Sequence, residues 1–336
     1  MLSRCLAALL FLCTAAVPAL AQEQQIRIGI GFGLAFLPLY VCEDLKLIEK
    51  QAQAEHLEVK ASFPRLMSAR QAQAEIASGA IDIAPFGAAP LLAAWDKAQG
   101  TPQQIFAVSG LASLPLVLLS NRPDEHSIAD LKPSDRIAMP TLTSPQMQLL
   151  EIASQKQFGR YDKLRGQVVE MSHADAVDAL GGGRQDEGAK DDVTAYFASP
   201  PYTQLALRDA NVHAILKSTD VMNGKFSFLV LGASKAAVEA KPQMPAIVAG
   251  AIEAAARIIR DDPRRAAQIF LTHEPSGVLS GAAAAAVIGE VKDEFGSAVY
   301  GLQTMAGFLN SRGELKAPPK SWKDVVTPAL LSSSSS

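Results

Sequence analysis

Cysteine, aromatic residues and net charge are all scarce in this sequence of 336 residues. It has three cysteines and an aromatic content of 6%, and its 31 basic and 34 acidic residues give a formal net charge of −3. Cys5 and Cys13 lie in a segment that we expect to be removed, so Cys42 has no partner for an internal disulfide and the fold must depend on its core. This near balance of charge offers no attraction for nucleic acid or for an anionic membrane.

The motifs of the common enzyme classes are missing as well. The histidines are scattered, without the spacing of a metal site, and no Gly-x-Ser-x-Gly elbow occurs. The glycine-rich stretch 29–33 is followed by Leu34 where a dinucleotide fingerprint needs its third glycine, and no Gly-Lys-Ser/Thr exists for a phosphate loop. Cys42 sits on an apolar helix face, which indicates a buried structural thiol. We therefore expect a non-enzyme with no catalytic residue, metal site or cofactor.

The N-terminal 21 residues have the pattern of an export signal. Arg4 supplies a positive start, residues 6–17 are apolar, and Ala19 and Ala21 form a small-x-small cleavage site. The apolar stretch is too short to span a bilayer, and Leu12 stands where a lipid anchor on Cys13 needs a small residue. We expect cleavage after Ala21 and a periplasmic protein; the alternative is a buried N-terminal core helix.

Behind the signal, short strands alternate with helices as far as residue 232, which predicts an α/β fold with parallel sheets. Two unusually apolar strands, at 114–119 and 226–232, break the alternation and bracket the middle of the chain. We interpret them as crossovers between two lobes: residues 22–115 and 230–330 form lobe 1, and residues 116–229 form lobe 2. From 234 to about 310 the chain is predicted to be helical, and 331–336 is a disordered serine tail.

Several strands end in a turn that leads into a helix start with proline, at 33–38, 86–90, 141–145 and 198–201. In open α/β sheets, ligands lie beyond the carboxyl ends of strands, where the free N–H groups of helix starts are found. Thr141, Thr143 and Ser144 add hydroxyls that suit an anion. Any single turn is explained equally by capping; the set of turns suggests ligand capture.

Aromatic side chains gather near these turns and suggest an apolar-walled pocket with few polar anchors. They are Phe32, Phe36, Phe63, Phe86, Tyr196 and Phe197. Arg65 is the candidate cation against a negative ligand group, with a solvated surface arginine as the alternative. His173, just after a strand, is a candidate donor to a ligand, or else a surface residue at a helix start.

Five segments together resemble the nitrate/sulfonate/taurine substrate-binding proteins of ABC importers. They lie at 26–29, 38–50, 76–84, 128–132 and 234–262. The resemblance implies a type II periplasmic binding fold, with two α/β lobes joined by two crossovers, that closes on a solute and delivers it to a permease with its ATPase. It also places ligand contacts at Gly33, Phe36, Phe86, Gly87, Ala88, Ala89, Thr141, Thr143, Ser144, Tyr196 and Ser199. The chain departs from the family in a polar insertion at 181–190 and in the sequence of its 140–144 turn.

The leading hypothesis is a monomeric periplasmic solute-binding protein that hinges near 113–121 and 224–232. A small organic anion such as a sulfonate fits the helix caps and Arg65. A thiamine-pyrimidine precursor or another flat heterocycle fits the aromatic turns and is the alternative ligand. An enzyme on the same fold, or a sensor module without a transporter, are the other possibilities that we consider.

Overall fold

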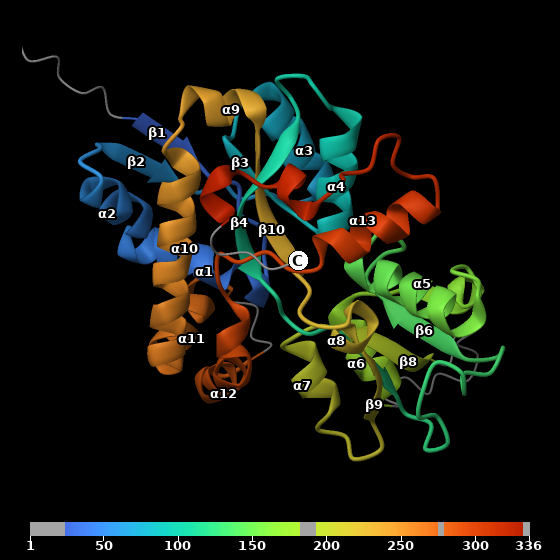
Figure 1. Ribbon diagram of the computed structural model, residues 1–336. Helices are drawn as coiled ribbons and strands as arrows, with labels where there is room; N and C mark the ends of the chain where they lie inside the picture. Colours follow the sequence, from blue (N-terminus) through green and yellow to red (C-terminus); the bar gives the residue numbers. More distant parts are fainter. Residues whose placement is uncertain (1–23, 182–192, 275–278, 332–336) are drawn as a thin grey trace, which may run out of the picture.

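The computed structural model describes residues 24–181, 193–274 and 279–331 (Figure 1). The expected signal, nearly all of the 181–190 insertion and most of the serine tail lie outside these ranges. The described chain forms two sheets with their own helices, a larger body above and a smaller one below in Figure 1. We call them lobe 1 and lobe 2. None of the described helices is both long and apolar enough to cross a membrane.

The sheet of lobe 1 is assembled from both ends of the chain. Its strands are β1 (Gln24–Arg27), β2 (Val59–Ser62), β3 (Ile83–Phe86), β4 (Ile105–Ala112) and β10 (Leu229–Ser234). β1 runs parallel to β2, and β10 is antiparallel to both β3 and β4. A parallel bridge between Ile28 and Ile83 joins the two groups, so the order is β2-β1-β3-β10-β4.

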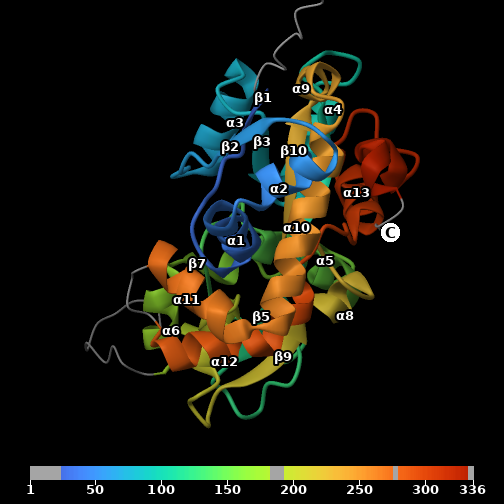
Figure 2. The ribbon, with the colours of Figure 1, turned by 90° about the vertical axis from the view of Figure 1, so that its left-hand side faces the viewer.

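Both faces of this sheet are buried under helices. Neighbouring residues of a strand point to opposite faces, so Ala107 and Val108 of β4 belong to different hydrophobic clusters. The helices are α1 (Leu37–Leu45), α2 (Leu47–Ala54), α3 (Ala69–Ser78), α4 (Ala88–Lys97), α9 (Lys235–Ala240), α10 (Met244–Asp261), α11 (Pro263–His273), α12 (Gly281–Val291) and α13 (Leu302–Ser311). Figure 2 shows α10 along the side of lobe 1, with α11 and α12 reaching toward lobe 2.

One predicted helix is two helices. The apolar spacing over 37–50 predicts continuous helix, whereas Lys46 adopts a left-handed conformation with φ of 51° and separates α1 from α2. The break turns the chain so that Leu47, Ile48 and Ala52 are all buried in the core. Side-chain burial therefore outweighs the regular helical pattern at this point.

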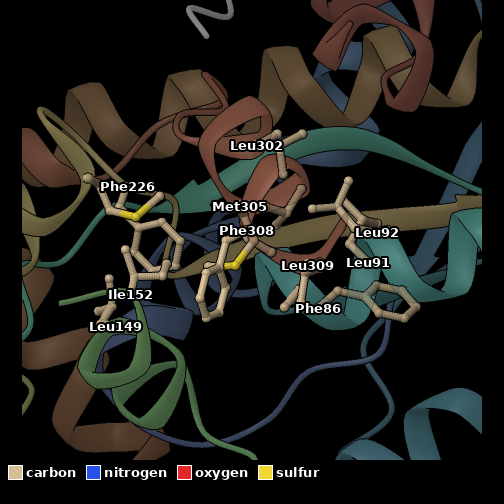
Figure 3. Close-up of a cluster of buried hydrophobic side chains, with 14 of the residues drawn as sticks. Phe86, Leu91, Leu92, Leu149, Ile152, Phe226, Leu302, Met305, Phe308 and Leu309 are labelled. Atoms are coloured by element: carbon tan, nitrogen blue, oxygen red, sulfur yellow. The ribbon is translucent and has the colours of Figure 1, made fainter. Parts of the chain in front are cut away.

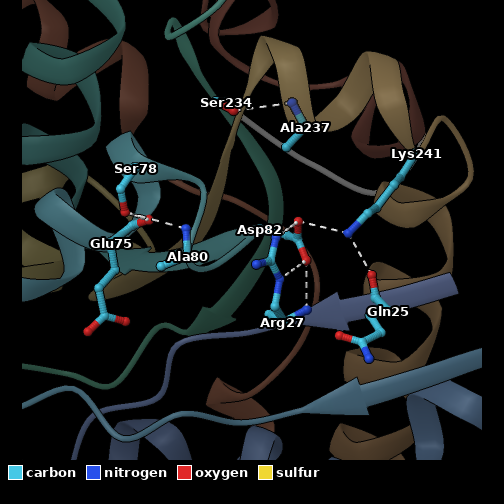
Figure 4. Close-up of polar contacts among 9 residues, drawn as sticks. All are labelled: Gln25, Arg27, Glu75, Ser78, Ala80, Asp82, Ser234, Ala237 and Lys241. Carbon is cyan, nitrogen blue, oxygen red and sulfur yellow. Dashed lines mark hydrogen bonds and ion pairs between the residues drawn. The ribbon is translucent and has the colours of Figure 1, made fainter.

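An ion-pair cluster around Asp82 fastens the start of the chain to the C-terminal helices (Figure 4). Asp82 accepts hydrogen bonds from the backbone and guanidinium of Arg27 in β1, and its Oδ1 lies 2.8 Å from Nζ of Lys241, which follows α9. Lys241 also donates to the carbonyl of Gln25 at 2.6 Å. Burial raises the pKa of Asp82, but the hydrogen bonds from Arg27 and Lys241 lower it more, so the pKa lies below its ordinary value.

Lobe 2 repeats the arrangement on a smaller scale. Its strands are β5 (Val117–Ser120), β6 (Arg136–Met139), β7 (Val168–Glu170), β8 (Val193–Ala198) and β9 (His213–Lys217), in the order β7-β6-β8-β5-β9. Its helices are α5 (Pro145–Phe158), α6 (His173–Leu180), α7 (Tyr202–Ala206) and α8 (Ser218–Met222). β5 runs antiparallel to its neighbours, as β10 does in lobe 1.

The chain passes between the sheets twice. The strand predicted at 114–119 begins only at Val117, and the one predicted at 226–232 begins at Leu229. The preceding apolar residues belong to the connections: Leu114, Leu116 and Phe226 are buried although they lie outside the strands. Leu116 and Phe226 are buried in the cluster that spans the lobes and Leu114 in a cluster of lobe 1, and burial of this kind gives the same apolar pattern as a buried strand.

A hydrophobic cluster spans the lobes beside these connections (Figure 3). Phe308 and Leu309 of α13 lie in it with Leu149 and Ile152 of α5, and with Leu91 of α4. The segment after α13 is held on α4, where the carboxylate of Asp96 accepts two backbone N–H groups from residues 316–317, each at 2.8 Å. The C-terminal region is therefore anchored on lobe 1 and touches lobe 2.

Candidate functional site

Two of the predicted helix starts, one from each lobe, meet. Gly87 is the N-cap of α4 after β3, and Ser144 is the N-cap of α5 after β6, where its hydroxyl accepts from the N–H of Met147. A Cβ placed on Gly87 would lie 3.7 Å from Cγ of Pro145, so the loops are in contact. A cavity of about 330 Å³ beside them is lined by Ala89 and by Thr143, among others. The loops thus converge between the lobes.

The two loops at this junction differ in how many of their side chains are exposed. Phe86, Ala88 and Ala89 are buried, so α4 presents mainly the backbone at Gly87. Thr141 and Thr143 are exposed, with their hydroxyls 3.3 Å apart. The N–H of Leu142 between them donates to the Glu170 carboxylate at 2.7 Å. One N–H group of the predicted anion-binding turn is therefore already bound to a carboxylate of the protein.

The predicted ligand contact at Gly33 also has its N–H group bound to a carboxylate of the protein. The N–H of Gly33 and the hydroxyl of Tyr40 both donate to Oε1 of Glu274, which follows α11; the Tyr40 bond measures 2.5 Å. Burial raises the pKa of the Tyr40 hydroxyl far above its usual value, and the adjacent Glu274 carboxylate raises it further, so this tyrosine is a hydrogen-bond donor. Phe36 closes over the backbone at Gly31.

Arg65 is close to this site but is already paired. Its guanidinium donates to Glu43 at 2.9 Å and lies 2.6 Å from Nδ1 of His273, whose Nε2 is 2.8 Å from Asp44. The guanidinium also lies over the ring of Tyr40, 5.3 Å from its centroid. Nη1 is buried and has no hydrogen-bond partner among the described residues. Contact between Arg65 and a ligand therefore stays a prediction, and its charge is largely balanced within lobe 1.

On lobe 2, His173 organises a cluster of aromatic and hydroxyl side chains. Its Nδ1 is hydrogen-bonded to the hydroxyl of Tyr196 and its Nε2 lies 3.2 Å from Oγ of Ser199. The ring stacks on Tyr202, with centroids 4.9 Å apart and an angle of 16°. Burial lowers the pKa of His173 to about 4, so the imidazole is neutral at neutral pH. The sequence predicted His173 as a possible donor to a ligand. In the structure His173 is half-buried and is hydrogen-bonded to two other predicted site residues, Tyr196 and Ser199.

Helix α7 brings the wall of lobe 2 against lobe 1. The amide of Gln204 in α7 donates to Glu290 of α12 at 3.2 Å, and Leu205 packs against a hydrophobic cluster of lobe 1. Tyr202 is the first residue of α7; burial raises its pKa, and the negative charge of Glu274 raises it further. The crevice therefore has the neutral aromatic groups of α7 on one wall and, on the other, the packed helices α11 and α12 with Glu274 at the end of α11.

The predicted aromatic wall is only partly assembled. Phe32, Phe36 and Phe86 line one cavity of about 380 Å³ on lobe 1. Phe197 and Tyr196 are fully buried in lobe 2, and Tyr196 reaches the crevice only through its hydrogen bond to His173. Adjacent residues of β8 point to opposite faces of a sheet that is covered on both sides, so Phe197 packs in the cluster that spans the lobes and Tyr196 in a cluster of lobe 2.

The sequence reasoning missed Tyr40, Tyr202 and Glu274. Tyr202 directly follows the 198–201 turn, so its position gave a usable signal. Glu274 gave none, because it lies far along the chain from Gly33 and pairs with it only through the fold. Among the described residues, no three His, Cys, Asp or Glu side chains gather in a way that would hold a metal ion.

The architecture has known counterparts, although the sequence matches no known protein-family model and no curated protein. The periplasmic aliphatic sulphonate binding protein SsuA from Escherichia coli aligns with a TM-score of 0.67 and 19% identity over 92% of this chain and 99% of that one. The Candida albicans CA3427 product, described as having the generic periplasmic binding protein fold, aligns with a TM-score of 0.59 and 13% identity over 93% and 96%. The chain has the type II periplasmic binding protein fold.

This fold confirms the predicted two-lobed α/β architecture. It does not by itself separate binding from catalysis. DszB, an enzyme, was solved as a cysteine-to-serine mutant in complex with biphenyl-2-sulfinic acid, and it aligns with a TM-score of 0.58 and 13% identity over 92% of this chain and 98% of that one. Function must therefore be argued from the crevice.

Proposed function

We propose that the chain is the solute-binding component of an ABC importer, which captures a small organic solute between its lobes and delivers it to a permease with its ATPase. The observation that carries the proposal is the contact of Gly87 in lobe 1 with Pro145 in lobe 2, at the carboxyl ends of strands in both sheets. Residues 22–115 and 230–330 would move as one lobe against 116–229, hinging at the two connections. After loss of residues 1–21 the protein would act as a periplasmic monomer.

Two ligand classes are supported by different observations. A sulfonate is favoured by the similarity to SsuA, which is described as binding aliphatic sulphonates, and by the exposed hydroxyls of Thr141 and Thr143. A flat heterocycle, such as a pyrimidine, is favoured by the stacked rings of His173 and Tyr202. The geometry supports the flat ligand better, because carboxylates already accept the N–H groups of Gly33 and Leu142.

Catalysis is the weaker interpretation. The cysteine of the described chain, Cys42, is fully buried in lobe 1, and burial raises the pKa of its thiol far above the usual value. His173 is neutral and is bonded to two hydroxyls. Both ring nitrogens of His173 have hydroxyl partners, Tyr196 and Ser199, so no carboxylate among the described residues orients the imidazole as a strong base toward Ser199.

The test is to identify the ligand directly. Small molecules that co-purify with the mature protein are released by denaturation and identified by mass spectrometry. Sulfonates, nitrate, pyrimidines and carboxylates are then added to ligand-free protein, and binding is measured by calorimetry and thermal shift. We expect one class to bind without being consumed, and His173→Ala to weaken a flat ligand by about 10-fold or more. Turnover of the bound compound, or an absence of binding in both experiments, would overturn the proposal.

A further inference from the structure

The Glu274 carboxylate is fixed at the lobe-1 wall of the crevice. Its backbone N–H donates to the carbonyl of Phe270 at 2.8 Å, which holds the residue at the end of α11. Oε1 accepts from both Gly33 and Tyr40, whereas no described residue donates to Oε2. A carboxylate has two oxygens, so Glu274 keeps acceptor capacity on Oε2 while Oε1 is held by two donors.

The charges around Glu274 do not cancel it. Arg65 is the nearby cation, and it is engaged by Glu43 and by the His273 ring, which in turn contacts Asp44. This wall therefore carries the carboxylates of Glu43, Asp44 and Glu274 and one guanidinium, which is paired with Glu43. The opposite wall contributes the neutral groups His173 and Tyr202.

The N–H groups that would receive an anion are also engaged. Gly33 donates to Glu274 on lobe 1 and Leu142 donates to Glu170 on lobe 2, so an N–H group at each of these two predicted ligand turns already binds a carboxylate of the protein. A free anion arriving there would displace or oppose a fixed negative charge. A positively charged N–H group would instead gain a charge-assisted hydrogen bond to Glu274.

We infer that Glu274 sets the charge preference of the crevice, which takes a flat ligand with a cationic N–H donor, such as an amidinium or a protonated amine on a ring, and rejects anions. The inference rests on the proposed function. The ring of the ligand would lie against Tyr202, and its cationic group would bind Oε2 of Glu274. A protein of this fold would then discriminate by charge in the direction opposite to a sulfonate binder.

A series of ligands that differ only in charge tests this on the mature protein. Benzamidine, benzamide, benzoate and benzenesulfonate share a ring and are titrated by calorimetry. We expect benzamidine to bind at least about 10-fold more tightly than benzamide, and neither anion to bind measurably. Tighter binding of either anion than of benzamidine, or binding of none of the four, overturns the inference.

Two variants that each remove one negative charge distinguish a direct contact with Glu274 from an effect of the protein's overall charge. Glu274→Gln keeps an oxygen for Gly33 and Tyr40 and should remove the preference for benzamidine over benzamide. Glu239→Gln, on the exposed face of α9, is the control and should leave it unchanged. An unchanged ratio in Glu274→Gln refutes the inference, and the wild-type series stands even if that variant fails to fold. A co-purifying sulfonate would refute the charge preference and leave solute capture intact.

Discussion

Arg312 forms a charged contact between the lobes whose strength can be measured. It lies just after α13, which is anchored on lobe 1, and its Nη1 is paired with Oε2 of Glu151 in α5. The Glu151 side chain is only 4% exposed, and its Oε1 accepts from Arg165 of lobe 2 at 2.7 Å. The Arg312 guanidinium also lies 4.4 Å from the ring centroid of Tyr161. A buried carboxylate of lobe 2 is therefore shared between Arg165 of lobe 2 and Arg312, which follows a helix of lobe 1.

Arg312→Met keeps the length of the side chain and removes its charge. Removing one partner of a buried ion pair costs about 3–5 kcal/mol, but here Arg165 remains on Glu151, which reduces the loss. The cation–π contact with Tyr161 adds about 0.5–2 kcal/mol. We therefore expect the closed arrangement to lose about 2–3 kcal/mol, which lowers the closed-to-open ratio roughly 30- to 150-fold.

Small-angle scattering and fluorescence transfer between labels on the two lobes measure this shift without ligand. The radius of gyration should increase in Arg312→Met and return toward the wild-type value when ligand is added. Arg160→Met is the matched control, because Arg160 pairs with Asp162 within lobe 2 and both side chains are exposed. If the two variants have the same dimensions and the same unfolding midpoint, Arg312 does not hold the lobes together.

Three further changes test the packing and the buried charges. Gly110→Ala places its Cβ 2.0 Å from the carbonyl oxygen of Ala298, so urea unfolding should show a loss of about 3 kcal/mol, whereas Gly166→Ala, with open space around it, should show little change. The pKa of His173 is about 4 in the folded protein and 6.5 in the unfolded chain, so unfolding between these pH values takes up a proton. The free energy of unfolding should therefore fall by up to about 3 kcal/mol between pH 6.5 and 4, and His173→Asn should flatten this slope. Asp82 has a lowered pKa, so its stabilising effect is complete above its unfolded value and is lost as pH falls below about 4; thermal unfolding of Asp82→Asn should lack this acid-sensitive step.

The sequence predicted the helices and strands well, but it predicted poorly which side chains contact one another. Alternating apolar runs and helix starts such as Ser144-Pro145 are local signals, so the α/β fold and the helix N-caps could be predicted. Apolar residues such as Leu114 and Leu116 were assigned to a strand, because burial in a connection produces the same pattern. A local pattern indicates that a segment is apolar and buried, but not which residues it packs against.

The candidate site shows the same limit more sharply. Gly33 and Thr143 were recognised from their turns, whose geometry is encoded within a few residues. The carboxylates that occupy the predicted N–H groups arrive from elsewhere, Glu274 from the end of α11 and Glu170 from the end of β7. Arg65 was singled out for its charge, but its ion pair with Glu43 and its contact with the His273 ring depend on the fold and are not visible in the sequence.

The position of β10 has a consequence for biosynthesis. This strand lies inside its sheet, between β3 and β4, yet the ribosome makes it only after every strand of lobe 2. While the nascent chain emerges, β3 and β4 have unpaired edges that invite association with other chains. Lobe 2, whose strands are contiguous, can fold during that interval. Holdase chaperones that bind during translation would therefore protect β3 and β4 above all.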